Sequence, residues 1–187
     1  PKGEYWVQPF VNVYTRFARA DGKTIWAHMD QWEGQNWRRS PGNLYGDPVK
    51  ISYDPASTKP ITLTADKVIP PVVVPAETES VKRLKIQSTI LTKWWGQPIY
   101  LGAVVQLPKD YDKHPDARYP IVYSHGHFSL RAPAVGSTPY WNADGTPRMI
   151  LVTLQHPSPF YDDSYGVNSA NNGPYGDAIM QELIPEV

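Results

Sequence analysis

Short stretches of alternating hydrophobic and polar residues fill the first part of the chain. Segment 5–29 alternates on both sides of Asp21-Gly22, and this turn dipeptide between alternating runs predicts a β-hairpin. Shorter alternating runs predict two further strands, at 49–54 and 61–69. We therefore expect a β-rich N-terminal region over residues 1–75.

Two segments in and after this region predict irregular structure. Segment 31–48 is too polar and too rich in Gly, Asn and Pro for a strand, and we interpret it as an ordered loop anchored by three aromatic residues: Trp32, Trp37 and Tyr45. The proline-rich run PPVVVPAETES at 70–80 predicts an extended connector. The domain boundary is therefore expected there.

The pattern changes after this connector, in residues 76–187. The runs at 119–124 and 149–155 are almost continuously apolar, which is typical of parallel strands covered on both faces. We expect these two strands to lie parallel, side by side or separated by one strand, with antiparallel strands beside them at 83–88 and 98–107. Segment 127–146 has room for a short helix or a lid-like loop.

The last ten residues have helical periodicity. Asp177 precedes this segment and is the expected N-cap, with one apolar face formed by Ile179, Leu183 and Ile184. Four strands and one helix leave a sheet edge and this helix face uncovered. We therefore expect the apolar face to contact a second polypeptide or a further segment.

Composition narrows the classes of function. The 187 residues contain 18 Lys+Arg and 18 Asp+Glu, and this balance argues against a nucleic acid or an anionic membrane as the main partner. There is no cysteine, so disulfides and thiol nucleophiles are excluded. The seven Trp and twelve Tyr favour clefts that are partly exposed to solvent, because these side chains carry a polar tip on an apolar body. No apolar run reaches the ~18 residues of a membrane span.

Several motifs in order resemble the esterase family of α/β-hydrolases that includes esterase D and enterochelin-esterase-like proteins. They are LPKDY at 107–111, YPIVYSHGHF at 119–128, MILVTLQH at 149–156 and ELIPEV at 182–187. Two longer segments resemble bacterial members of the group, DQWEGQNWRRSPGNLY at 30–45 and YDDSYGVNSANNGPYGDA at 161–178. The resemblance implies an α/β fold: the N-terminal half of an α/β-hydrolase sheet preceded by a β-rich accessory region.

The sequence departs from this family at the nucleophile. Such hydrolases carry a G-x-S-x-G elbow, and no serine of the chain has glycine at both positions two residues away. The resemblance implies that the elbow follows on the strand after ELIPEV and that the acid and the histidine come later still. We therefore expect the catalytic Ser, Asp and His beyond residue 187, on the C-terminal remainder of the polypeptide or on a second chain. No cofactor is expected. We expect a periplasmic or secreted location.

The stretch IVYSHGHF at 121–128 is the first candidate site. The resemblance implies that the loop after this strand supplies one backbone N–H of the oxyanion hole, from His127 or Phe128, with Gly126 allowing a tight turn. The alternative is a strand end that is merely capped by histidine. His125 is a further candidate, for substrate binding. A zinc pair of His125 and His127 is disfavoured, because alternate strand residues point to opposite sides and no third ligand has suitable spacing.

A second group of candidates follows the strand at 149–155. His156 lies at its carboxyl end, where open α/β sheets bind ligands, although a structural histidine is an equal alternative. The polar loop after it could bind an ester substrate, and the residues of interest there are Asp162, Asp163, Tyr165, Asn168, Asn171 and Asn172. The same Asn and Asp side chains are also typical of loops that stabilise their own turns.

Three pairs of neighbouring residues are further candidates. Asp162-Asp163 would suit acid–base chemistry or calcium, but adjacent side chains rarely converge on one point. Trp94-Trp95 is interpreted as packing between the two parts of the chain, with a carbohydrate-stacking platform as the alternative. Arg38-Arg39 would bind a carboxylate or form a solvated face.

Two functions remain open on the sequence alone. One is the N-terminal portion of a serine carboxylic-ester hydrolase, inactive by itself, which acts on a small-molecule ester and binds neither nucleic acid nor membrane. The other is a non-catalytic carbohydrate- or protein-binding module with a surface rich in Trp and Tyr. The buried parallel-strand pattern favours the hydrolase, since binding modules are mostly antiparallel.

Overall fold

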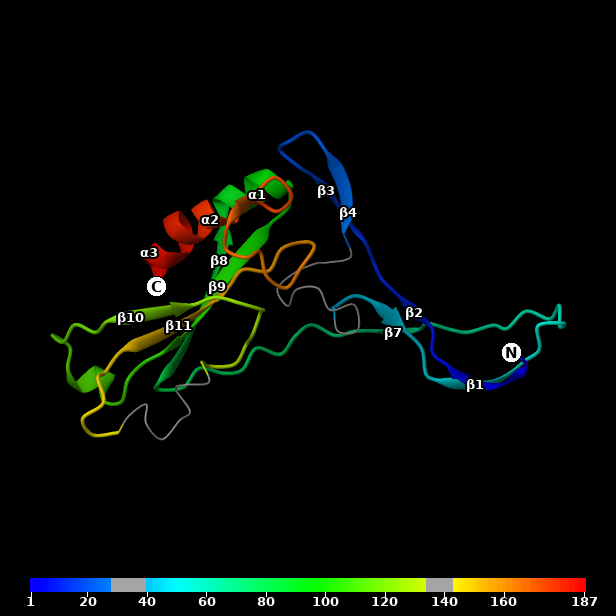
Figure 1. Ribbon diagram of the computed structural model, residues 1–187, viewed down its shortest axis with the longest axis horizontal. Coiled ribbons are helices and arrows are strands. Elements are labelled where there is room, and N and C mark those ends of the chain that lie inside the picture. The colour runs from blue at the N-terminus through cyan, green and yellow to red at the C-terminus, as the bar shows by residue number, and fades with distance from the viewer. Residues whose placement is uncertain (28–39, 134–142) are drawn as a thin grey trace.

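The computed structural model describes residues 1–27, 40–133 and 143–187 (Figure 1). Strands form most of its regular structure, and the helices are few and short. One four-stranded sheet is mixed, whereas the smaller sheets are antiparallel. The described chain is therefore an α/β structure dominated by strands. Within these residues, no helix has the length and apolar character needed to cross a membrane.

The mixed sheet organises the C-terminal part of the molecule. Its strand order is β10-β11-β9-β8, and the strands are β8 (Val81–Ser88), β9 (Ile99–Gln106), β10 (Ile121–Ser124) and β11 (Ile150–Gln155). β10 and β11 are parallel neighbours, while β9 runs antiparallel to both β8 and β11. This confirms the predicted arrangement of all four strands.

Short helices gather on one side of this sheet (Figure 1). They are α1 (Thr89–Trp95), α2 (Tyr175–Ala178), the π-helical turn η3 (Ile179–Leu183) and α3 (Ile184–Glu186), with a separate 3-10 turn η1 (Tyr111–Lys113). α1 begins where the Ser88 hydroxyl accepts the N–H of Leu91 at 3.0 Å, and it ends at Gly96 with φ 68°. A Cβ at Gly96 would lie 2.4 Å from the backbone oxygen of Ala18, so glycine is required there.

The C-terminal helical segment starts earlier than predicted. α2 begins at Tyr175, so Asp177 lies inside its first turn and is not the N-cap. The backbone N–H of Asp177 donates to the side-chain oxygen of Asn168 at 3.0 Å. One N–H group of this helix start therefore donates to a side chain nine residues upstream, a contact that local sequence signals do not reveal.

The apolar core lies between the sheet and these helices. Its buried members include Leu91, Trp95, Leu101, Ala103, Val152, Tyr175, Ile179 and Leu183. Ile179 is 5% exposed and Leu183 is fully buried, while Ile184 is half-buried against the same core. The expectation that this helix face is left uncovered is therefore wrong, because β8 and β9 pack against η3 within the chain.

β10, by contrast, is exposed along its whole length. Ile121, Val122 and Tyr123 are 42%, 45% and 39% exposed. The strand pairs only with β11, so its outer edge carries no partner among the described residues. The apolar run 119–124 therefore did form a parallel strand, but the prediction that both of its faces are covered is wrong for residues 121–124.

The N-terminal part consists of small antiparallel sheets. The strands are β1 (Gly3–Val7) with β6 (Val49–Tyr53), β2 (Phe10–Val11) with β5 (Leu44–Tyr45) and β7 (Lys67–Val68), and β3 (Thr15–Ala18) with β4 (Thr24–Ala27). The last pair is the predicted hairpin, with Gly22 at φ 80° in its turn. Tyr45 belongs to a strand and not to a loop, and only Lys67–Val68 of the predicted strand 61–69 pairs. The anchors Trp32 and Trp37 lie outside the described residues, as do Arg38 and Arg39 and residues 134–142 of the segment expected to hold a helix or lid.

The β3–β4 hairpin packs onto the C-terminal part. Phe17 belongs to the main core, and the guanidinium of Arg19 lies 5.3 Å and 5.6 Å from the ring centres of Trp94 and Trp95. Arg19 also donates to the backbone oxygen of Ala170 at 2.8 Å. Trp94-Trp95 therefore lies between the two parts of the chain, as predicted.

Candidate functional site

Two polar loops meet at the carboxyl ends of the parallel strands. β10 ends at Ser124 and is followed by His125, Gly126 and His127, whereas β11 ends at Gln155 and is followed by His156. Because the strands are parallel neighbours, both loops leave the sheet at the same edge. This edge brings together residues that are about thirty positions apart in the sequence.

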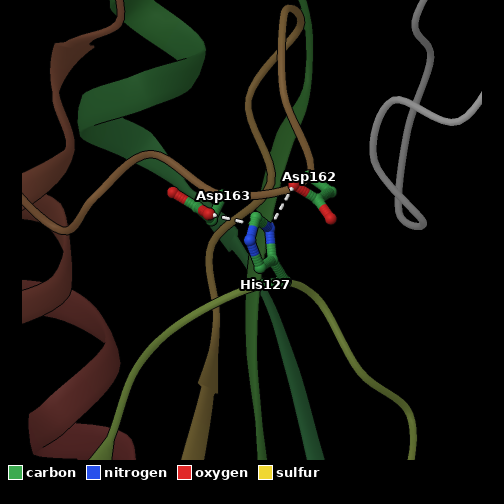
Figure 2. Close-up of side chains that lie close together, drawn as sticks. All are labelled: His127, Asp162 and Asp163. Atoms are coloured by element: carbon green, nitrogen blue, oxygen red, sulfur yellow. Dashed lines mark hydrogen bonds and ion pairs between the residues drawn. The ribbon is translucent and has the colours of Figure 1, made fainter.

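His127 and two aspartates form the tightest polar cluster at this edge. Its Nδ1 lies 3.0 Å from Oδ1 of Asp162 and 3.2 Å from Oδ2 of Asp163, and Figure 2 shows both carboxylates directed at the imidazole. The His127 side chain is 80% exposed, whereas that of Asp163 is only 7% exposed. The expectation that these adjacent carboxylates do not converge is therefore wrong, because the loop conformation turns both toward one nitrogen.

The two carboxylates change the acid–base behaviour of His127. The hydrogen bond with Asp162 raises the pKa of the imidazole, and the negative charges of Asp162 and Asp163 raise it further. The protonated ring can donate Nδ1–H to either oxygen, which makes an ion pair across the two loops. The contact thus ties the loop after β10 to the loop after β11.

His156 has the opposite environment. It is 1% exposed, and its Nδ1 accepts the backbone N–H of Ser164 at 3.1 Å, with the Ser164 hydroxyl at the same distance. Burial lowers the pKa of His156, and the backbone donor at Nδ1 places the proton of the neutral ring on Nε2. Nε2 is itself buried and has no partner among the described residues. His156 is therefore a neutral ring with one hydrogen-bond donor left over.

The remaining candidates in the loop have different environments. Tyr165 is 69% exposed and has φ 58°, and its N–H donates to Oδ1 of Asp163 at 2.9 Å. Asn168 accepts from the first turn of α2, and Asn171 is exposed. Asn172 is buried, and its Oδ1 has no hydrogen-bond partner in the described part of the chain. The loop therefore combines turn-stabilising contacts with exposed side chains.

The histidine loop itself differs from expectation at its glycine. Gly126 has no positive φ, and a Cβ built there meets nothing within 4 Å. The backbone turn therefore does not require glycine, although there is open space beside Gly126. The ring of His125 is exposed and lies 6.0 Å from that of His156, and Phe128 is half-buried.

A separate hollow lies beside Trp94. It has a volume of about 380 Å³ and is lined by Trp94, Asn168, Ser169, Ala170, Gly173 and Pro174. Its walls come from α1 and from the strands β12 (Asn168–Ser169) and β13 (Gly173–Pro174). Trp94 and Asn168 were both candidates in the sequence, but nothing in the sequence placed them together.

Sequence reasoning missed two features of this edge. Ser164 was not a candidate, although it fixes the tautomer of His156. The pairing of His127 with Asp162 was also missed, because 35 residues separate them and no local spacing rule links the two loops. A comparison of the chain with models of known protein families and with curated proteins finds no match.

Proposed function

We propose that this chain is the N-terminal portion of a serine carboxylic-ester hydrolase with an α/β-hydrolase sheet. In this proposal it contributes one side of the oxyanion hole and part of the pocket for a small-molecule ester. The observation that carries the proposal is the meeting of the His127 loop with the 162–164 loop at the carboxyl ends of β10 and β11. Ligands of open α/β sheets bind at this position.

The backbone at His127 supports the oxyanion role. Within the described residues, no group accepts a hydrogen bond from the His127 N–H. An uncommitted backbone donor near the end of a parallel strand suits a developing oxyanion, and losing one such donor costs about 10²–10³ in rate in known hydrolases.

The catalytic Ser, Asp and His are proposed to lie outside residues 1–187. The outer edge of β10 supports this. Ile121, Val122 and Tyr123 are 39–45% exposed, and among the described residues the strand pairs only with β11, so it is suited to pair with a further strand. A strand added there would end beside the His127 loop. The elbow serine of such a strand would then face the proposed oxyanion donor across the pocket.

Labelling with a fluorophosphonate tests this proposal. Protein isolated from its native source, with whatever is joined or bound to this chain, is treated with the probe, and labelled peptides are identified by mass spectrometry. We expect label on a serine outside residues 1–187, in a G-x-S-x-G sequence. Stoichiometric label on a serine of this chain would show that the nucleophile is misplaced.

The hollow beside Trp94 favours a second candidate, carbohydrate binding without catalysis. Its tryptophan wall and the amide of Asn168 are side chains that stack on and hydrogen-bond to sugar rings. The same preparation separates the two functions. Absence of any labelled serine, together with saccharide binding that Trp94→Ala abolishes, would replace the hydrolase proposal by this one.

A further inference from the structure

Three metal-ligand side chains converge where the two loops meet. His127 offers Nδ1, and Asp162 and Asp163 each offer a carboxylate oxygen, with these three atoms all within 4.8 Å of one another. Figure 2 shows the carboxylates approaching the imidazole from two sides. The histidine comes from the loop after β10, and the two aspartates come from the loop after β11. These strands are neighbours, so the sheet fixes the relative position of the two loops.

The separations match those between ligands of one small cation. Nδ1 lies 3.0 Å and 3.2 Å from the two nearest carboxylate oxygens. Ligands bound tetrahedrally to Zn²⁺ at its usual bond lengths are roughly 3.3 Å apart. These two nitrogen–oxygen separations are therefore within a few tenths of an ångström of the spacing that an ion bound to Nδ1 and either carboxylate would need.

The charge of the cluster also calls for a cation. Asp163 is a carboxylate with a 7% exposed side chain, and a buried charge is stable only when it is paired or bound to a metal. Among the described residues, the only cationic group within ion-pair distance of Asp162 or Asp163 is His127, which is charged only when protonated. A divalent ion held between the three side chains would offset the negative charges of both carboxylates.

The donor set selects the kind of metal. One imidazole nitrogen with two carboxylate oxygens suits Zn²⁺ and neighbouring first-row transition ions. Ca²⁺ takes six to eight oxygen ligands, and an imidazole nitrogen is not among its usual donors. The second oxygen of Asp163 accepts the N–H of Tyr165, which orients the carboxylate as an outer contact of a metal ligand does.

We infer that His127, Asp162 and Asp163 form a site for a divalent transition ion, Zn²⁺ above all. The ion ties the loop after β10 to the loop after β11, and the 80% exposed side of His127 leaves room for water or a ligand atom on the metal. The inference concerns the same loop as the proposed oxyanion hole, but it rests on the side chains and not on the backbone N–H. The inference of a metal site therefore does not depend on ester hydrolysis.

Titration calorimetry with the metal alone tests the site. Chelator-treated protein is titrated with ZnCl₂ and, separately, with CaCl₂, and Co²⁺ is added to a further sample for its visible absorption. We expect one Zn²⁺ per chain, weaker binding of Ca²⁺, and Co²⁺ bands of a low-coordinate nitrogen–oxygen site. His127→Ala and Asp162→Asn should each weaken Zn²⁺ binding by at least about tenfold.

His114→Ala is the matched control. His114 also has aspartates close to it in the sequence, at Asp110, Asp112 and Asp116, but in the described chain they do not form a group of converging ligands with it. This variant should bind Zn²⁺ like the parent, and circular dichroism should show all variants folded. Zn²⁺ binding that is absent, unchanged by both site variants, or equally lost in His114→Ala would overturn the inference. Tighter binding of Ca²⁺ than of Zn²⁺ would overturn the assigned class of metal.

Discussion

The imidazole of His156 receives both hydrogen-bond donors of Ser164 at a single nitrogen. This contact holds the loop after β11 against the end of the strand, and the ring is fully enclosed. A proton on Nδ1 would remove the acceptor and leave the Ser164 N–H buried without a partner. Folding therefore selects the neutral ring, which agrees with the lowered pKa of His156.

This environment predicts a pH-dependent stability. Because the pKa of His156 is lower in the folded state than its usual value of about 6.5, the unfolded chain binds more protons as the pH falls. The contribution is complete above about pH 6.5 and is lost as the pH falls through that value toward the folded pKa. Urea unfolding of His156→Gln should show a shallower loss of unfolding free energy than the parent between about pH 7 and pH 5.

The exposed histidine His114 provides the comparison. His114→Gln should follow the parent across the same pH range. A His156→Gln curve parallel to the parent curve would contradict the buried neutral ring.

At the scale of elements, one carboxylate of the π-helical turn η3 binds the start of α1. Oε1 of Glu182 accepts the backbone N–H groups of Thr89 and Ile90, each at 3.0 Å, and its other oxygen is hydrogen-bonded to the Ser88 hydroxyl. These donors are the unsatisfied groups at the start of α1. A negative charge at a helix N-terminus is also favoured by the helix dipole.

Glu182→Gln should therefore lower the unfolding free energy by about 1–2 kcal/mol. The amide keeps one acceptor oxygen, but it loses the charge and offers a donor where another donor already lies. Guanidinium unfolding followed by circular dichroism measures the change. Glu186→Gln, at an exposed position in α3, should change stability by less than about 0.5 kcal/mol. Equal effects of the two substitutions would contradict the capping role.

These elements also show what sequence patterns can and cannot predict. Periodicity was sufficient for all four strands of the mixed sheet, because alternation and apolar runs depend on neighbours along the chain. The start of α2 was misplaced, since the N–H of Asp177 in its first turn donates to Asn168 of β12. The convergence of Asp162 and Asp163 on His127 was missed for the same reason: it depends on the path of two loops and not on local spacing.

At the scale of the whole molecule, one arginine connects the N-terminal hairpin to the rest. Arg19 is 7% exposed and contacts both tryptophans of α1, the backbone of Ala170 and the carboxylate of Asp21. Cation–π and charged hydrogen bonds each contribute more when desolvated. The hairpin should therefore depend on this side chain for its position.

Arg19→Met tests this dependence. It keeps the apolar stem but removes the charge and the donors, so we expect a loss of about 2 kcal/mol of unfolding free energy. Hydrogen exchange should accelerate in β3 and β4 more than in β9 and β11. Arg16→Met, at an exposed position of β3, is the control and should leave exchange unchanged. Uniform acceleration in all strands would show that Arg19 stabilises the fold in general and not the hairpin contact.

The outer edge of β10, which has no partner strand in the described part of the chain, has a consequence for colloidal behaviour. Natural proteins prevent edge-to-edge association with lysine, proline or a bulge on the outermost strand. The residues of β10, IVYS, include none of these side chains, and three of the four are large and at least 39% exposed. We therefore expect self-association through this strand, and not unfolding, to limit the concentration that the chain reaches in solution. A single lysine on this strand would improve solubility without touching the core.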